Sequence, residues 1–309
     1  MADDKSLPFG KHLASSDKKT RDNAVNSLTA FLSGATDPLP QAEMAKLWKG
    51  IFYCFWMSDK PLVQQALATD LAQILLSIPS AQASLAFLKG FWESIVREWS
   101  GIDRLRLDKY YLLIRRFVNA SFRLLARETW DEALINQYNT ILTAQGGPLC
   151  PDDIRIPSGL TYHLADVYIE ELNKASANPP IPSPLPTPLI TIIRPFLDVA
   201  ARTPTKTTYQ RIQSAFIDPL LEALATPTPN SEDEQRASKR QKTSTSAYDA
   251  LLANACLSNP AKEGVLTKEE IRKAILKRIF DIAGSESTRD ANRRKMYVVW
   301  RSNADEDEE

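Results

Sequence analysis

Cysteine and histidine are the side chains that could act as nucleophile and base, and the chain has few of either. A nucleophilic cysteine needs a nearby base and a lowered pKa. Cys54 is the first candidate, but neither histidine, His12 or His163, is near it in sequence. Cys54 also lies in the aromatic-rich stretch LWKGIFYCFWMSDKP, at 47–61, and thiols in such surroundings are commonly buried and inert. We therefore interpret Cys54 as a core residue.

One histidine stands in a pattern that could bind a metal. His163, Asp166 and Glu170 are spaced at i, i+3 and i+7, on one face of a helix. A metal site would need ligands from a second helix, and the sequence has no second histidine cluster, so a solvated polar face is favoured. Phosphate-binding glycine loops and a G-x-S-x-G motif are also missing. The sequence therefore predicts no metal, cofactor, small-molecule substrate or catalytic residue, and disfavours an enzyme.

A row of basic side chains follows the longest predicted helix, IDRLRLDKYYLLIRRFVNASFRLLARETW, at 102–130. Its members are Arg106, Lys109, Arg116, Arg123 and Arg127, at spacings of three, seven, seven and four. Such a row can follow a phosphate backbone without reading sequence. The alternative is a solvated face paired with acids of the same and neighbouring helices. We assign the candidate RNA contacts to Arg106, Lys109, Arg115, Arg116, Arg123 and Arg127.

A second basic cluster, RASKRQK at 236–242, lies in a segment without large apolar residues. Accessible clusters of this kind are typical of nuclear-import signals, although many are incidental. We assign the candidate signal to Arg236, Lys239, Arg240 and Lys242.

The composition limits the remaining classes. The 309 residues carry 38 basic and 38 acidic side chains, so any nucleic-acid contact requires a local patch. Glycine occurs 10 times and proline 20 times, which disfavours tight hairpins and supplies helix stops. Three separated cysteines indicate a reducing compartment without a disulfide framework. Neither a secretory signal nor a membrane span is evident, so we expect no membrane partner.

Apolar residues recur at steps of three and four over most of the chain, which predicts amphipathic helices. The clearest runs lie at 21–34, 41–57, 61–78, 85–99, 102–130, 130–144 and 158–175. Helices of this length joined by short proline or glycine turns are antiparallel neighbours. Stacked in order, they predict an all-α fold of antiparallel helical repeats, a HEAT- or armadillo-like α-solenoid.

Composition divides the chain into four parts. They are a helical solenoid, a disordered basic linker, a C-terminal helical segment and an acidic tail, at 1–225, 226–247, 248–302 and 303–309. Within the first part, six prolines at 178–188 favour an extended strap. Within the third, Thr267 and Glu270 predict a capping box at the start of the C-terminal helix.

Three sequence blocks are specific enough to indicate a family, which the helical periodicity alone does not. They read WKGIFYCFWMSDKPL, RLDKYYLLIR and GLTYHLADVYIEEL, at 48–62, 106–115 and 159–172. Together they resemble the ribosomal RNA-processing protein 1 family, the nucleolar factors of large-subunit assembly. The resemblance covers about 8–173 and is weaker beyond. The sequence resembles a fungal-like member of this family, and the long basic tail of some animal members is not seen in it.

The resemblance implies a non-catalytic protein of the nucleus and nucleolus that is needed for pre-rRNA processing. Its implied partners are the pre-60S particle, pre-rRNA, other assembly factors and ribosomal proteins. One interpretation is a scaffold whose basic row touches RNA phosphates. The alternative is a purely protein-binding adaptor within pre-60S particles, without direct RNA contact. We expect Tyr53 and Lys60, beside the turn that ends the first block, to contact a protein partner.

Overall fold

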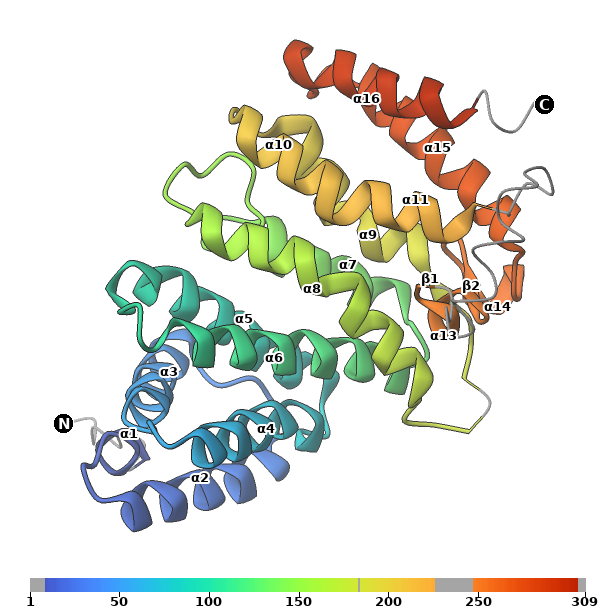
Figure 1. Ribbon diagram of the computed structural model, residues 1–309. Helices are drawn as coiled ribbons and strands as arrows, with labels where there is room; N and C mark the ends of the chain where they lie inside the picture. The colour runs from blue at the N-terminus through green and yellow to red at the C-terminus, as the bar shows by residue number, and fades with distance from the viewer. Residues whose placement is uncertain (1–8, 183, 226–246, 305–309) are drawn as a thin grey trace, which may run out of the picture.

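The computed structural model describes residues 9–182, 184–225 and 247–304, which form helices stacked in two layers (Figure 1). The predicted all-α solenoid is confirmed. The first helices are α1 (Phe9–Leu13), α2 (Lys18–Ser33), α3 (Gln41–Trp56), α4 (Pro61–Ser77), α5 (Ala81–Glu98), the 3₁₀ turn η1 (Trp99–Gly101), α6 (Leu107–Arg127) and α7 (Glu132–Thr143). The later ones are α8 (Ser158–Ala177), α9 (Leu189–Arg202), α10 (Lys206–Ile212), the π-helical turn η2 (Gln213–Ile217), α11 (Asp218–Leu224), α13 (Asp249–Leu252), α14 (Pro260–Glu263), α15 (Lys268–Gly284) and α16 (Asp290–Ala304).

Each layer consists of alternate helices. In one layer α3, α5, α7, α9 and α15 pack side by side, and in the other α4, α6 and α8 do so, followed by α10 and α11. Short turns join most consecutive helices, so neighbours along the chain run antiparallel. The apolar faces are buried between the layers, and the core is therefore one continuous cluster from α1 to α16.

A proline inside α9 is accommodated by a neighbouring helix. Pro195 has no N–H to offer the carbonyl of Thr191, four residues earlier in the helix. The side-chain amide of Asn139, from α7, donates to that carbonyl instead, at 2.8 Å. The hydrogen bond that proline removes is thus replaced by a bond between adjacent helices of the layer.

A short pair of strands ties the proline-rich strap to the C-terminal part of the chain. β1 (Thr187–Pro188) pairs in parallel with β2 (Ala255–Cys256). The N–H of Thr187 also donates to the carbonyl of Asn254, at 2.9 Å. The extended strap at 178–188 was predicted from its prolines, whereas its pairing with a second strand was not.

The C-terminal helices complete the stack. α15 packs on α9 and α11, and α16 packs on α15 and α9. The predicted capping box is confirmed, because Thr267 Oγ1 accepts from the N–H of Glu270 at 3.2 Å and Glu270 Oε2 accepts from the N–H of Thr267 at 2.8 Å. α16 runs to Ala304, into the range assigned to the acidic tail. Residues 305–309, and 226–246 of the predicted linker, lie outside the described residues.

Three aromatic residues of α3, Trp48, Phe52 and Phe55, are buried in the core. Trp48 lies 4.6 Å from Phe87 and 5.4 Å from Phe91, measured between ring centroids. Its indole N–H donates to the carbonyl of Phe87 at 3.0 Å. The indole also lies directly against Gly90, where a Cβ would be 2.4 Å from Trp48 Cδ1. Glycine at this position therefore sets how closely α3 and α5 approach.

Replacing Gly90 by alanine is expected to lower the free energy of unfolding by about 1–3 kcal/mol, because an over-packed core forces side chains and backbone to shift. Gly10→Ala is the matched control, since a Cβ on Gly10 meets no neighbouring atom within 4 Å. Urea unfolding followed by circular dichroism measures both variants. Equal stability of the two would contradict the close packing at Gly90.

Candidate nucleic-acid interface on helix α6

The residues that could do chemistry do not converge. Cys54 is 1% exposed, and burial raises the pKa of its thiol to about 11, which disfavours the thiolate needed for attack. His163 Nε2 lies 3.2 Å from the carbonyl oxygen of Tyr111, and burial lowers the pKa of this histidine. Asp166 pairs with Arg211 at 2.6 Å. In the described part of the chain, no cluster of His, Cys, Asp or Glu could hold a metal ion.

A membrane-spanning helix needs about 20 predominantly apolar residues. Within the described ranges, no helix combines sufficient length with sufficient apolar character to span a membrane.

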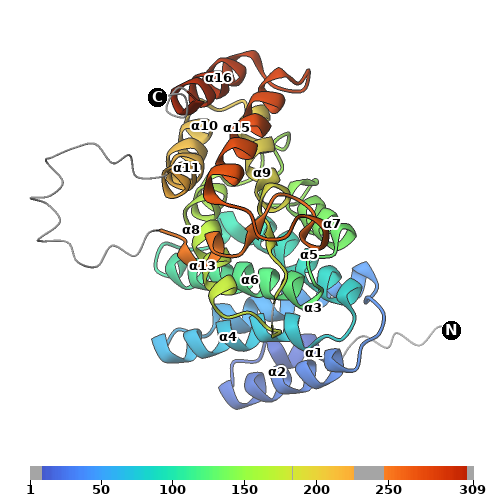
Figure 2. The same cartoon turned by 90° about the vertical axis from the view of Figure 1, so that its right-hand side faces the viewer.

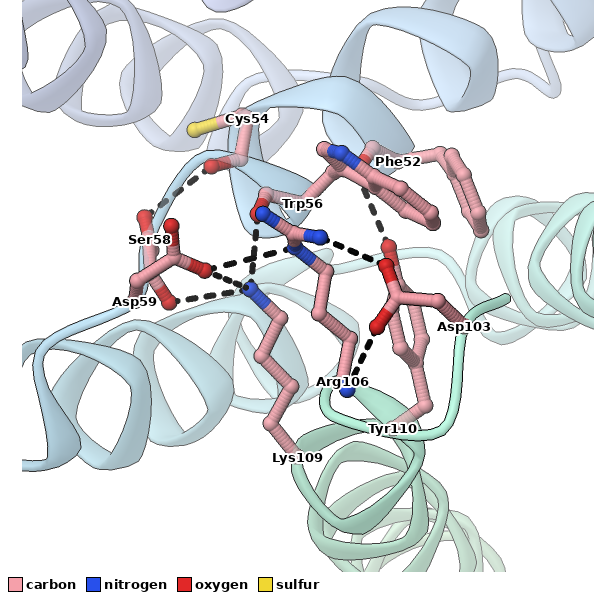
Figure 3. A network of polar contacts seen from close by, with 9 residues as sticks. All are labelled: Phe52, Cys54, Trp56, Ser58, Asp59, Asp103, Arg106, Lys109 and Tyr110. Atoms are coloured by element: carbon pink, nitrogen blue, oxygen red, sulfur yellow. Dashed lines mark hydrogen bonds and ion pairs between the residues drawn. The ribbon is translucent and has the colours of Figure 1, made fainter. Parts of the chain in front are cut away.

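The basic row begins where three helices meet (Figure 3). Here the start of α6 approaches the turn between α3 and α4. The side chain of Lys109 is 3% exposed, and its ammonium donates to the carbonyl oxygens of Trp56 and Ser58, at 2.7 and 3.1 Å. The third donor goes to Asp59 Oδ1, at 3.1 Å. All three donors of the ammonium are thus used inside the protein.

This turn attracts a cation because α3 ends there. The last carbonyls of a helix have no intrahelical donor and form the negative end of the helix dipole. Lys109 supplies both donors and positive charge at this end. Burial lowers the pKa of Lys109, although the bond to Asp59 opposes the fall. The same bond holds the pKa of Asp59 below its ordinary value.

Arg106 covers the network from its more exposed side. Its Nη1 donates to Asp103 Oδ2 at 2.5 Å. Its Nε lies 3.4 Å from Asp59 Oδ1, and the centre of its guanidinium lies 4.8 Å from the centroid of the Trp56 ring. Asp59 therefore receives two cations from α6, and the charges at the turn are balanced within the protein.

Tyr110 completes the contact from the next position on α6. Its ring stacks on Phe52 with centroids 5.1 Å apart, and its hydroxyl donates to the carbonyl of Phe52 at 3.3 Å. Ser58 closes the turn by donating to the carbonyl of Cys54 at 3.0 Å. The first two sequence blocks that carry the resemblance therefore meet in space as two sides of one contact (Figure 3).

Two more of the candidate RNA contacts, Arg115 and Arg127, hold α6 against its neighbours. Arg115 Nη2 lies 2.6 Å from Glu170 and 2.8 Å from Glu171, both on α8. Arg127 Nη1 donates to the carbonyl of Leu76, at the end of α4, at 2.9 Å. Like Lys109, these arginines are engaged within the solenoid.

Arg116 and Arg123 differ from the rest of the row. Arg116 is exposed and Arg123 is partly exposed, and neither forms an ion pair or hydrogen bond with another of the residues that the structure describes. They lie on the same side of α6, about 10 Å apart along its axis. Five of the six predicted RNA contacts lie on α6, and Arg106 lies directly before it. Of these six, Arg116 and Arg123 form the candidate RNA interface.

The remaining predicted site residues are Tyr53, Lys60 and the candidate import signal. Tyr53 is 43% exposed on α3, and Lys60 is exposed at the start of α4. The candidate import signal, formed by Arg236, Lys239, Arg240 and Lys242, falls outside the described residues.

Acidic partners on the same and neighbouring helices were an expected alternative, but Asp59 and Glu171 were not predicted individually. Asp59 binds both Lys109 and Arg106, and Glu171 binds Arg115 from a buried position. Both acids lie inside the sequence blocks that carry the resemblance, and their place in these blocks was the one feature of the sequence that pointed to them. Acidic residues within otherwise apolar blocks are expected to have partners.

Comparison with known proteins places these blocks in a family. A family model described as "Nucleolar protein, Nop52" matches residues 4–298. The chain belongs to the Nop52 family. The predicted resemblance is confirmed by relatives named ribosomal RNA processing protein 1 homologs. Homolog B of Mus musculus is 32% identical over 95% of this chain and 43% of its own length.

Two human relatives of this Nop52-family chain also match most of it while extending beyond the matched part. Homolog B of Homo sapiens is 37% identical over 70% of the chain and 28% of its own length. Homolog A of Homo sapiens is 28% identical over 96% of the chain and 69% of its own length. The chain thus spans less than half the length of the homolog B proteins that it matches.

Replacing Lys109 by methionine should destabilise this Nop52-family solenoid by about 3 kcal/mol. The substitution leaves the carbonyls of Trp56 and Ser58 without the donor seen here, and unsatisfied buried polar groups cost about 1–3 kcal/mol each. Arg116→Met is the matched control, with an expected effect within about 0.5 kcal/mol. Urea unfolding compares the two, and similar losses would argue against the structural role of Lys109.

Proposed function

We propose that the chain is a non-catalytic assembly factor of the large (60S) ribosomal subunit, needed for pre-rRNA processing in the nucleolus. The family match over 4–298 and the names of the relatives support this function. The solenoid acts as a scaffold, because stacked helices offer an extended surface to RNA, assembly factors and ribosomal proteins at once. Entry into the nucleus uses the basic cluster at 236–242.

The observation that carries the RNA part of the proposal is the pair Arg116 and Arg123. Exposed guanidinium groups without an internal partner can bind phosphate oxygens through two parallel hydrogen bonds. Such contacts position a protein on RNA without reading its sequence. Each phosphate contact on a single strand contributes about 0.7 to the slope of log affinity against log salt. Two contacts therefore contribute about 1.4.

The double variant R116E/R123E is expected to reduce co-sedimentation with large-subunit precursors near physiological salt. Its remaining association should also depend less on salt, because two phosphate contacts are lost. The control K19E/K46E reverses two exposed lysines on α2 and α3 with the same change in net charge. If both double variants sediment alike, the arginine pair does not contribute to binding.

The second candidate function is a protein-binding adaptor within pre-60S particles that does not touch RNA. It is favoured by the internal pairing of Arg106, Lys109, Arg115 and Arg127, and by the net charge of zero. RNA crosslinking in cells discriminates between the two functions. Crosslinks at α6 support the scaffold, and intact particle association without any crosslink supports the adaptor.

Tyr53 and Lys60 are proposed to contact a protein partner in either case. The double variant Y53A/K60A is expected to lose particle association while its unfolding free energy changes by less than about 1 kcal/mol, since Tyr53 is 43% exposed and Lys60 is exposed. The control K262A/V265A removes an exposed lysine and an exposed apolar residue elsewhere. Equal particle association of the two variants would remove Tyr53 and Lys60 from the partner surface.

A further inference from the structure

The last two helices present a surface that the proposal above does not use. α15 and α16 are joined by residues 285–289 and pack as an antiparallel pair at the C-terminal end of the solenoid (Figures 1 and 2). Their apolar residues Ile275, Ile279 and Met296 are buried toward the core. The side of the pair that faces away from the core forms its outer surface, which includes Lys277, Phe280, Arg294 and Arg301.

Three aromatic rings, Phe280, Tyr297 and Trp300, form what we call the aromatic seam between α15 and α16. The ring centroid of Phe280 lies 5.3 Å from that of Tyr297 and 4.9 Å from that of Trp300. Phe280 is 41% exposed, and the other two rings are half-buried. Large apolar side chains are normally covered, so a surface group of them indicates a binding site.

Positive charge flanks the aromatic seam on both helices. Lys277 precedes Phe280 by three positions on α15, and helical spacing places both on one face. Arg294 and Arg301 stand three positions before and four after Tyr297, on the same face of α16. These three flanking cations are exposed, and none has an ion pair or hydrogen bond to another residue within the described ranges.

Acidic side chains on the two helices do not cancel this charge. Glu269 pairs with Lys273 at 2.6 Å, and Asp290 lies 3.4 Å from Arg293. Glu270 accepts from Thr267 in the capping box, and Asp281, exposed on α15, offsets one of the three flanking cations. Among the described residues of α15 and α16, basic side chains therefore outnumber acidic ones around the aromatic seam, although the whole chain is neutral.

We infer that the outer surface of the α15–α16 pair binds single-stranded RNA, with unpaired bases stacked on the aromatic seam and phosphates held by the flanking cations. Every base has a flat π face, so aromatic side chains bind single strands with little sequence preference, while neighbouring cations follow the backbone. A duplex keeps its bases stacked inside the helix and cannot use the seam. The inference rests on the proposed function, in which the chain acts on pre-rRNA, and adds a second contact that is selective for unpaired segments.

An acidic polypeptide is the other ligand that the flanking cations attract. Its carboxylates would pair with Arg294 and Arg301, but contact with the three rings would require apolar side chains placed between those carboxylates. In a single strand of RNA every nucleotide supplies both a flat base for the rings and a phosphate for the cations, and we therefore favour RNA as the ligand.

Fluorescence anisotropy of the full chain with a mixed-sequence single-stranded RNA, and with the duplex of the same sequence, tests this inference. The wild type should prefer the single strand. F280L keeps an apolar side chain but removes the ring, and should weaken single-strand binding about fivefold or more, the loss of one base stack. R294E/R301E should weaken it as well and lower the salt slope by about 1.4. K19E/K46E is the matched control and should bind the single strand as tightly as the wild type does.

Several outcomes would overturn the inference. They are equal affinity for the duplex, unchanged single-strand binding by folded F280L, equal losses in R294E/R301E and K19E/K46E, or equally tight binding of polyglutamate. The last outcome would assign the surface to acidic polypeptides. Circular dichroism and unfolding midpoints verify that each variant folds. The assay is independent of R116E/R123E sedimentation, so single-strand binding can fail while particle association persists, and the reverse.

Discussion

A buried ammonium group must find acceptors, and this requirement fixes the meeting point of α3, α4 and α6. Charge inside a protein is costly, so Lys109 is tolerated only where oxygen atoms already converge. The turn after α3 supplies two carbonyls and one carboxylate. The start of α6 is thereby held against α3 and α4. Because α8 packs on α6, the placement of α6 also sets where α8 lies.

The basic residues of α6 differ mainly in what lies beside them. Those that reach a helix end or a carboxylate hold the layers together, and their charge is satisfied in the folded chain. Arg116 and Arg123 have no such neighbour among the described residues and keep their capacity to bind an external anion. One amphipathic helix thus carries structural cations and accessible cations in a single row, which explains how a neutral chain can still offer a basic surface.

Apolar spacing was sufficient to predict the long helices from α2 to α8, because such spacing reports one buried face. It did not predict the short helices α1, α13 and α14, or α16. The capping box at Thr267 followed from the chemistry of two side chains. The burial of Lys109 did not follow, because its acceptors come from residues about 50 positions away that the sequence does not place beside it. Which cations of the basic row are paired inside the protein and which are accessible also depends on contacts between residues far apart in the sequence. β1 and β2 were also missed, since two residues per strand leave no alternating pattern.

The parallel pairing of β1 with β2 has a consequence for the integrity of the chain. It joins a strand that precedes residues 226–246 to one that follows them, and α13 and α15 add contacts to α8 and α9 across the same interval. A cleaved peptide bond within 226–246 would leave all of these contacts in place. A molecule nicked there would separate into two fragments under denaturing conditions, yet would remain a single particle in solution.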